Sequence, residues 1–145
     1  MYTVEKIPYG SENYQKTVDL RNEVMRKPIG RSIENDDLSY EQEADIFGVF
    51  EGDQLIGTGI MHYPEGDAAK IHFLCVDPSL QKSGIGALII GTMEDKARED
   101  GKVEAYLEAR MTAFGFYKKL GYEEYGEVYL LPNAPIEHVK MKKPL

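Results

Sequence analysis

Apolar and polar residues recur with two different periods along this chain, one typical of helices and one typical of strands. The helical period predicts a helix capped by Ser11 and running to about Met25, and a second from about Gly84 to Glu99. One face of the second helix is apolar and is expected to enter the core, through Ile85, Leu88, Ile89, Met93 and Ala97. A short third helix, from about Ala113 to Leu120, is predicted to end at Gly121.

Short apolar or alternating runs bounded by turn residues predict seven strands: Tyr2–Ile7, Ile46–Phe50, Leu55–Tyr63, Ala69–Val76, Val103–Glu108, Tyr122–Leu131 and Glu137–Lys142. The turn at 51–54 makes the second and third of these an antiparallel hairpin. Because a helix connects Ala69–Val76 to Val103–Glu108, we expect these two strands to be parallel. The segment 31–43 is polar and weakly periodic, so a mobile loop and a short helix both remain open.

Composition narrows the class of protein. The 145 residues, 42% of them hydrophobic and without internal repeats, predict a single domain spanning 1–145. No apolar run approaches the roughly 18 residues that span a bilayer, and the N-terminus lacks the apolar stretch of a signal peptide, so we expect a cytoplasmic protein without a membrane partner. Seventeen basic against 25 acidic side chains give a net charge of −8, which argues against nucleic-acid binding and permits a cationic substrate.

The chain has one cysteine, Cys75, inside the strand Ala69–Val76. A single cysteine excludes an intramolecular disulfide and argues against a cysteine-based metal cluster. We therefore expect no metal, and we interpret Cys75 as a small core residue.

A glycine-spaced turn, Gln81-Lys82-Ser83-Gly84-Ile85-Gly86-Ala87, connects an apolar strand to the long amphipathic helix. Glycine lets the backbone approach an anion closely, and the first N–H groups of a helix point at such an anion without intrahelical partners. The turn therefore indicates a phosphate site. The same residues also suit a tight strand-to-helix connection that binds nothing, so context has to decide.

The context is a resemblance to the Gcn5-related N-acetyltransferases (GNAT family). The segment Gln81–Ala87 matches the pyrophosphate loop of that family, and Ala113-Phe114-Gly115-Phe116-Tyr117-Lys118-Lys119-Leu120-Gly121-Tyr122 is similar to its Ala-x-x-Phe-Tyr-x-x-x-Gly-Phe/Tyr motif. The order of strands and helices agrees over nearly the whole chain. The resemblance implies an α/β (α+β) fold with a mixed, largely antiparallel central sheet of about six to seven strands, a splayed parallel pair and about four flanking helices. It also implies transfer of an acetyl group from acetyl-CoA to a primary amine of a small molecule or peptide.

The resemblance further implies where acetyl-CoA binds. The pantetheine arm is expected in the gap beside the strand at Leu74, Cys75 and Val76, with a backbone N–H of Leu74 or Val76 near the thioester oxygen. The pyrophosphate is expected on the residues of the turn: Gln81, Lys82, Ser83, Gly84, Ile85, Gly86 and Ala87. Phe116 flanks the tyrosine of the second motif. Arg110 stands where many family members have an asparagine that contacts pantetheine, so it binds a CoA phosphate, an acceptor carboxylate or only solvent.

Tyr117 matches the family tyrosine that protonates the departing thiolate, and a phenol with a pKa near 10 keeps its proton at neutral pH. A structural role as a core tyrosine is the alternative. The amine also needs a base, and the family has no single position for it. Strand alternation would place His72 on the same face as Leu74 and Val76, and Glu108, His138 and the weaker candidate His62 are its rivals.

In this fold the acceptor site is walled by segments here numbered 21–43 and 130–136. The acidic residues of the first segment favour a cationic acceptor, whereas Arg21, Arg26, Lys27 and Arg31 favour a carboxylate, and a solvated charged face is the third interpretation. A non-catalytic acyl-CoA-binding module is the alternative to an enzyme. Family members often pair through sheet edges, so a homodimer also stays open.

Overall fold

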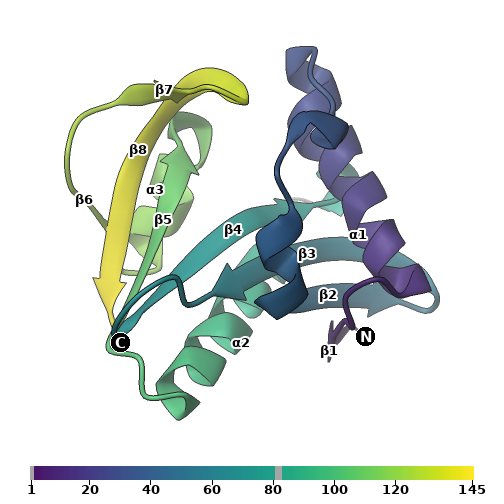
Figure 1. The fold of residues 1–145 in the computed structure, drawn as a ribbon, viewed down its shortest axis with the longest axis horizontal. Coiled ribbons are helices and arrows are strands. Elements are labelled where there is room, and N and C mark those ends of the chain that lie inside the picture. Colours follow the sequence, from purple (N-terminus) through teal and green to yellow (C-terminus); the bar gives the residue numbers. More distant parts are fainter. Residues whose placement is uncertain (1, 81–82) are drawn as a thin grey trace.

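A mixed, twisted sheet forms the framework of the computed structural model, which describes residues 2–80 and 83–145 (Figure 1). Its strands follow the order β1-β2-β3-β4-β5-β8-β6, with β7 paired to β8. The only parallel pair among them is β4–β5, as the crossover helix predicts. The strands are β1 (Thr3–Lys6), β2 (Asp45–Glu51), β3 (Gln54–His62), β4 (Ala68–Val76), β5 (Glu104–Arg110), β6 (Glu123–Glu124), β7 (Tyr129–Leu131) and β8 (Ala134–Pro144).

Three α-helices, against about four expected, occur in the described residues: α1 (Glu12–Arg21), α2 (Ile85–Glu99) and α3 (Phe114–Lys119). The Ser11 hydroxyl accepts a hydrogen bond from the Tyr14 N–H and caps α1 as predicted. After α1 the chain continues as a π-helical turn, η1 (Asn22–Arg26), and short 3₁₀ turns replace the predicted loop or helix in 31–43. These and the other 3₁₀ turns are η2 (Lys27–Ile29), η3 (Ile33–Asn35), η4 (Ser39–Glu43), η5 (Pro78–Leu80) and η6 (Met111–Ala113).

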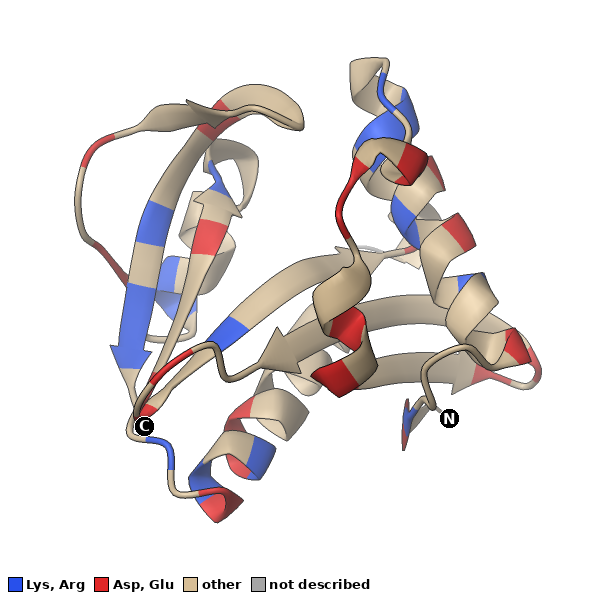
Figure 2. Ribbon diagram, in the orientation of Figure 1, with Lys and Arg blue, Asp and Glu red and all other residues tan. Residues whose placement is uncertain are grey.

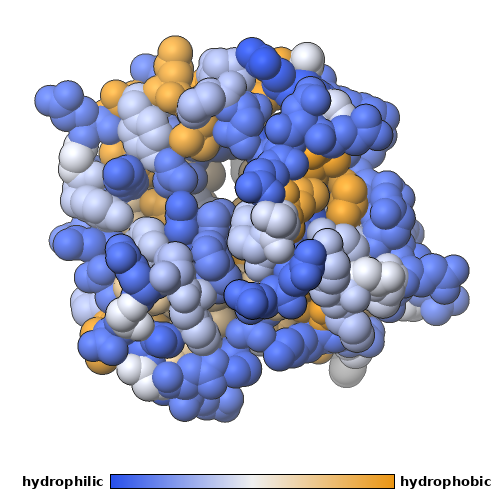
Figure 3. All heavy atoms as spheres, in the orientation of Figure 1, coloured by the Kyte–Doolittle hydropathy of each residue, from blue (hydrophilic) through white to orange (hydrophobic). Residues whose placement is uncertain are grey.

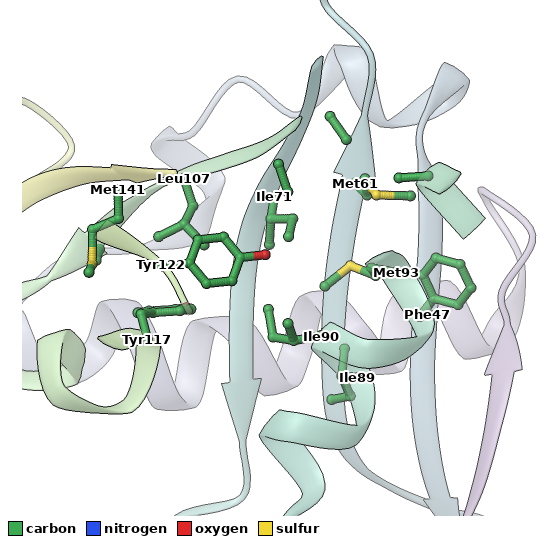
Figure 4. Packing of buried hydrophobic residues seen from close by; sticks show 14 of the residues in the cluster. Phe47, Met61, Ile71, Ile89, Ile90, Met93, Leu107, Tyr117, Tyr122 and Met141 are labelled. Atoms are coloured by element: carbon green, nitrogen blue, oxygen red, sulfur yellow. The ribbon is translucent and has the colours of Figure 1, made fainter. Parts of the chain in front are cut away.

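The larger core lies between α2 and the sheet (Figure 4). Two glycines of β3 let the helix approach, because a Cβ at Gly59 would stand 2.8 Å from Ile89 and 2.9 Å from Met93. Four of the five predicted core positions of α2 are buried. The prediction for Leu88 is wrong, since its side chain is 42% exposed and Ile90 takes the buried position instead. Each residue of a helix is rotated by 100° from the one before it, so positions 86, 90, 93 and 97 lie close together on one face and position 88 lies away from that face.

The C-terminal strands differ from the prediction of one strand over Tyr122–Leu131. The chain instead forms two short strands, β6 and β7, that both pair with β8. Gly126, with φ of +88°, lies between them in a conformation that side chains of other residues rarely adopt. The β7–β8 connection is also tighter than predicted, because β8 begins at Ala134 and includes Pro135.

The parallel pairing of β4 with β5 is short. It covers only the four residue pairs from Ala68↔Glu104 to Ile71↔Leu107, after which the two strands diverge (Figure 1). A bulge follows in β4, where two residues stand opposite the single Gly59 between the pairs Thr58↔Cys75 and Ile60↔His72. Within this bulge Phe73 has φ of +51°. The sheet is therefore split at its centre.

A buried ion pair attaches the η4 turn to α1. The Arg21 guanidinium donates to both carboxylate oxygens of Glu41, over 2.7 and 3.0 Å, and both side chains are fully buried. The Tyr14 hydroxyl donates to the same carboxylate over 2.6 Å. Such a pair is costly to break, because removal of one partner leaves the other charge buried without compensation.

We predict that Glu41→Gln lowers the free energy of unfolding by about 3–5 kcal/mol, since the Arg21 charge would lose its buried partner. Urea unfolding followed by circular dichroism measures the change. Glu23→Gln removes the carboxylate of an exposed ion pair with Lys27 and serves as the matched control, expected to unfold like the wild type. Equal midpoints for Glu41→Gln and the control would contradict the structural importance of this pair.

Candidate active site

A cavity of about 340 Å³ lies where β4 and β5 separate. Its walls come from η1 and the turns after it, from β4 and β5, from η6 and α3, and from the β7–β8 hairpin. Figure 3 shows this face of the molecule hollowed between the hairpin and the end of α1. Both segments predicted to wall an acceptor site, 21–43 and 130–136, contribute lining residues, which are Met25, Arg26, Asp36, Asp37, Tyr40, Leu131, Asn133 and Ala134.

The cavity brings together most of the predicted catalytic residues. Tyr117, His72 and Glu108 all line it, although they come from α3, β4 and β5. Leu74, Arg110 and His138 line it too. Cys75, Val76 and Phe116 are not among its lining residues. The Cys75 side chain is buried, which raises the pKa of its thiol to about 12, as suits a core residue.

Tyr117 is positioned by neighbouring aromatic rings. Its ring makes edge-on contacts with Phe116 and Tyr122, at centroid distances of 5.1 and 5.8 Å. Figure 4 shows Tyr117 beside Tyr122. The Tyr122 hydroxyl in turn donates to Glu94 over 2.8 Å. Burial raises the pKa of the Tyr117 phenol, so the hydroxyl keeps its proton at neutral pH. Its hydroxyl makes no hydrogen bond to another described residue, which leaves it available to a bound molecule.

His72 does not lie on the predicted face. The bulge at Phe73 interrupts the alternation of β4, so His72 packs beside Tyr40 whereas Leu74 and Val76 pack against the larger core. The His72 Nε2 atom is 3.1 Å from Nδ1 of His62. Burial, followed by the nearby charge of Lys70, lowers the pKa of His72 to about 3, so its ring is neutral at physiological pH.

The two other candidate bases, Glu108 and His138, make hydrogen bonds within the protein. The Glu108 carboxylate accepts a hydrogen bond from the Tyr129 hydroxyl and lies 3.5 Å from the Lys70 ammonium. The His138 Nδ1 atom lies 2.7 Å from the Ile136 carbonyl oxygen, which requires a proton on Nδ1 and leaves Nε2 as an acceptor. Burial lowers the pKa of His138 as well. Both residues therefore contribute polar atoms whose orientation is already set.

Arg110 is half-buried, whereas one of the three interpretations expected it to be exposed to solvent. One of its terminal nitrogens donates to the Met25 carbonyl over 2.5 Å, and its Nε is buried without a partner among the described residues. Burial, together with the nearby charge of Arg26, lowers the pKa of this guanidinium. A buried guanidinium with an unsatisfied donor is suited to an acceptor group of a bound molecule.

The charged residues of the acceptor-side wall pair with one another. Arg26 donates to both carboxylate oxygens of Asp36 over 2.9 Å, and the Asn133 side-chain amide donates to the same carboxylate over 2.6 Å. Acidic and basic positions accordingly lie side by side around the end of α1 (Figure 2). Arg21 is likewise paired with Glu41. The charges of these two arginines and two acidic residues are therefore not available to select an acceptor. Asn133, 97 residues from Asp36, gave no sequence signal for this link.

The N-terminus of α2 has the geometry of an anion site. Gly84 caps it with φ of +89°, and the first hydrogen bond within the helix runs from the Leu88 N–H to the Gly84 carbonyl. The N–H groups of Ile85, Gly86 and Ala87 make no hydrogen bond to another described residue, and the first turn carries no acidic side chain. Ser83 is exposed beside it, and the predicted Gln81 and Lys82 lie outside the described residues.

Gly86 has a packing role that the sequence did not reveal. A Cβ at this position would stand 3.1 Å from the Phe116 ring, so glycine lets α2 and α3 approach each other. Phe116 therefore connects the two predicted motifs physically. Within residues 2–80 and 83–145, no three histidine, cysteine or acidic side chains converge to hold a metal ion, and no helix there is long and apolar enough to cross a membrane.

Comparison with known proteins agrees with this architecture. A family model described as "Acetyltransferase (GNAT) domain" matches residues 11–145. The uncharacterized N-acetyltransferase YjcF of Bacillus subtilis is 29% identical over 137 residues, which are 94% of this chain and 96% of YjcF. An aminoglycoside 6'-N-acetyltransferase complexed with coenzyme A superposes with a TM-score of 0.80 at 17% identity, covering 98% of this chain and 96% of that one. A GNAT family acetyltransferase from Elizabethkingia anophelis with acetyl-CoA bound gives 0.74 at 16%, covering 99% and 98%.

The matched family model spans the split sheet, the glycine turn and the tyrosine helix together, and the relative covers nearly the same length. An acyltransferase with a GNAT fold accounts for these features jointly. The chain belongs to the GNAT acetyltransferase family.

Proposed function

We propose that this protein is an N-acetyltransferase that moves the acetyl group of acetyl-CoA to a primary amine of a small molecule or peptide. The main support is Tyr117, which lines the cavity where β4 and β5 separate and whose hydroxyl makes no hydrogen bond to another described residue. A donor lying in the split and an acceptor entering from the side of η1 would meet beside this hydroxyl.

The donor site is supported by two features of the backbone. Beyond Ile71, the side of β4 that faces β5 has no strand partner among the described residues, so the amides of a pantetheine arm can pair with it as an added strand would. The N-terminus of α2 suits the pyrophosphate, because its first N–H groups make no hydrogen bond to another described residue and its dipole favours an anion. Two structural neighbours were solved with coenzyme A or acetyl-CoA, which supports this class of donor.

The proposed reaction is direct attack. The amine nitrogen forms a bond to the thioester carbon, and a backbone N–H at Leu74 or Val76 stabilises the oxyanion, a contribution of about 3 kcal/mol per donor. The carbon–sulfur bond then breaks, and the thiolate takes the Tyr117 proton. An alkyl ammonium acceptor gives up two protons in total. One goes to solvent and the other replaces the proton that Tyr117 donates.

We predict that Tyr117→Phe lowers kcat by about 100-fold or more while the KM for acetyl-CoA stays near the wild-type value, because only the proton donor is lost. Free thiol release from acetyl-CoA measures turnover, with kanamycin, spermidine, lysine and an alanine-initiated peptide as amines. Tyr125→Phe removes a hydroxyl outside the cavity and is the matched control. Full turnover in Tyr117→Phe would exclude the general-acid role. Acetyl-CoA binding without turnover for any amine would favour the acyl-CoA-binding module.

A second prediction concerns the anion site. Gly84→Glu places a carboxylate at the N-terminus of α2, and we expect it to abolish the rise in melting temperature that acetyl-CoA gives the wild type. Gly101→Glu is the matched control, because Gly101 also has positive φ, has open space around it and lies at the opposite end of α2. Both variants place a side chain at a positive φ, so loss of the shift in Gly84→Glu alone supports donor binding here. Equal shifts in the two variants would contradict the assignment.

A further inference from the structure

Two imidazole rings connect the cavity to the outside of the molecule. His72, near the end of the paired part of β4, lines the cavity, whereas His62, the last residue of β3, is partly exposed and is not among the lining residues. Nε2 of His72 lies 3.1 Å from Nδ1 of His62, which is hydrogen-bond distance. Both rings also pack against Tyr40 in a tilted arrangement, each at a centroid distance of 4.8 Å, which restricts their relative orientation.

The hydrogen bond determines which nitrogens remain available. One of the two facing nitrogens must carry a proton and the other must accept it. If His72 donates from Nε2, its Nδ1 keeps a lone pair and makes no hydrogen bond to another described residue. His62 then accepts at Nδ1 and carries its own proton on Nε2. In this arrangement the pair takes up a proton at the cavity and releases another at the surface.

We propose that His72 and His62 form a proton relay that carries the acceptor's ammonium proton from the cavity to solvent. The inference rests on the proposed acetyltransferase function. The ammonium proton moves to Nδ1 of His72 while the proton on Nε2 of His72 moves to Nδ1 of His62, and His62 releases its Nε2 proton to water. The relay resets when the same transfers run in reverse with water in the cavity after the products leave.

A relay explains how His72 can assist although it is a weak base. Burial, and after it the charges of Lys70 from β4, the neighbouring His62 and Arg21 from α1, disfavour a positive charge on His72, and the Tyr40 ring from η4 packs against it. In the relay His72 gains one proton as it loses another, so it never has to hold that charge. The positive charge passes to the more exposed His62, whose environment is less restrictive.

The positions of the protons on the two histidine rings are tested first, without any acceptor. Nuclear magnetic resonance of protein labelled with ¹⁵N at the histidine ring nitrogens reports which nitrogen carries each proton between pH 5 and 8. We expect neutral His72 protonated at Nε2 throughout this range, and its signal to change in His62→Gln. A neutral His72 protonated at Nδ1 would overturn the relay, because that nitrogen could then accept no proton from the cavity.

The second arm is kinetic and uses the amine with the highest turnover among kanamycin, spermidine, lysine and the alanine-initiated peptide. We expect His62→Gln to lower kcat about tenfold or more with both KM values unchanged, and added imidazole to restore part of the rate. Tyr63→Phe, which removes the hydroxyl hydrogen bond of the neighbouring residue to Asp100, is the matched control and should retain wild-type kcat.

Three outcomes separate the hypotheses. Unchanged kcat in folded His62→Gln overturns the relay and leaves the proposed function intact. A loss of kcat that imidazole does not restore, or that comes with raised KM values, shows a structural role and also overturns the relay. Absence of turnover with every amine in the wild type overturns the proposed function, and the relay with it.

Discussion

The short parallel pairing of β4 and β5 is the constraint on which the rest of this structure depends. Four residue pairs join the strands, and beyond Ile71 and Leu107 the hydrogen-bonding groups of the facing edges are left to other partners. The bulge at Phe73 turns β4 away at the same place. The cavity lies at this split, next to an unpaired strand edge, and both Tyr117 of α3 and His72 of β4 line it.

Two charge pairs stabilise the walls of the cavity. Arg21 with Glu41 and Arg26 with Asp36 attach the turns after α1, and Asn133 extends the second pair to the β7–β8 hairpin. The turns after α1 and the β7–β8 hairpin lie on different sides of the split, so the hydrogen bond between Asn133 and Asp36 crosses the cavity. The charged residues in these two pairs are therefore already neutralised by one another, whereas Asp37 and Arg110 line the cavity without an ion-pair partner among the described residues.

Much of this fold was predictable from periodicity and local signals. The Ser11 cap, the β2–β3 hairpin, the crossover that makes β4 and β5 parallel, and the family assignment all rest on residues close in sequence. The errors have physical causes. The prediction for His72 assumed an unbroken alternation of side chains along β4, and the bulge places His72 on the other face. Leu88 is exposed because the geometry of the helix brings Ile90 to the buried face instead. The Asp36–Asn133 link and the contact of Gly86 with Phe116 depend on tertiary packing, which leaves no local pattern.

Amide hydrogen exchange of residues 72–76 of β4, with and without saturating acetyl-CoA, tests most directly whether the donor binds in the split. If the donor pairs with the free edge of this strand, the amide protons there become hydrogen-bonded and exchange more slowly, whereas those of β2, on the far side of β3, keep their rates. Slower exchange confined to β4 and the N-terminus of α2 is the predicted result. A raised melting temperature with acetyl-CoA and unchanged exchange in β4 would contradict this binding mode, because the donor would then bind outside the split.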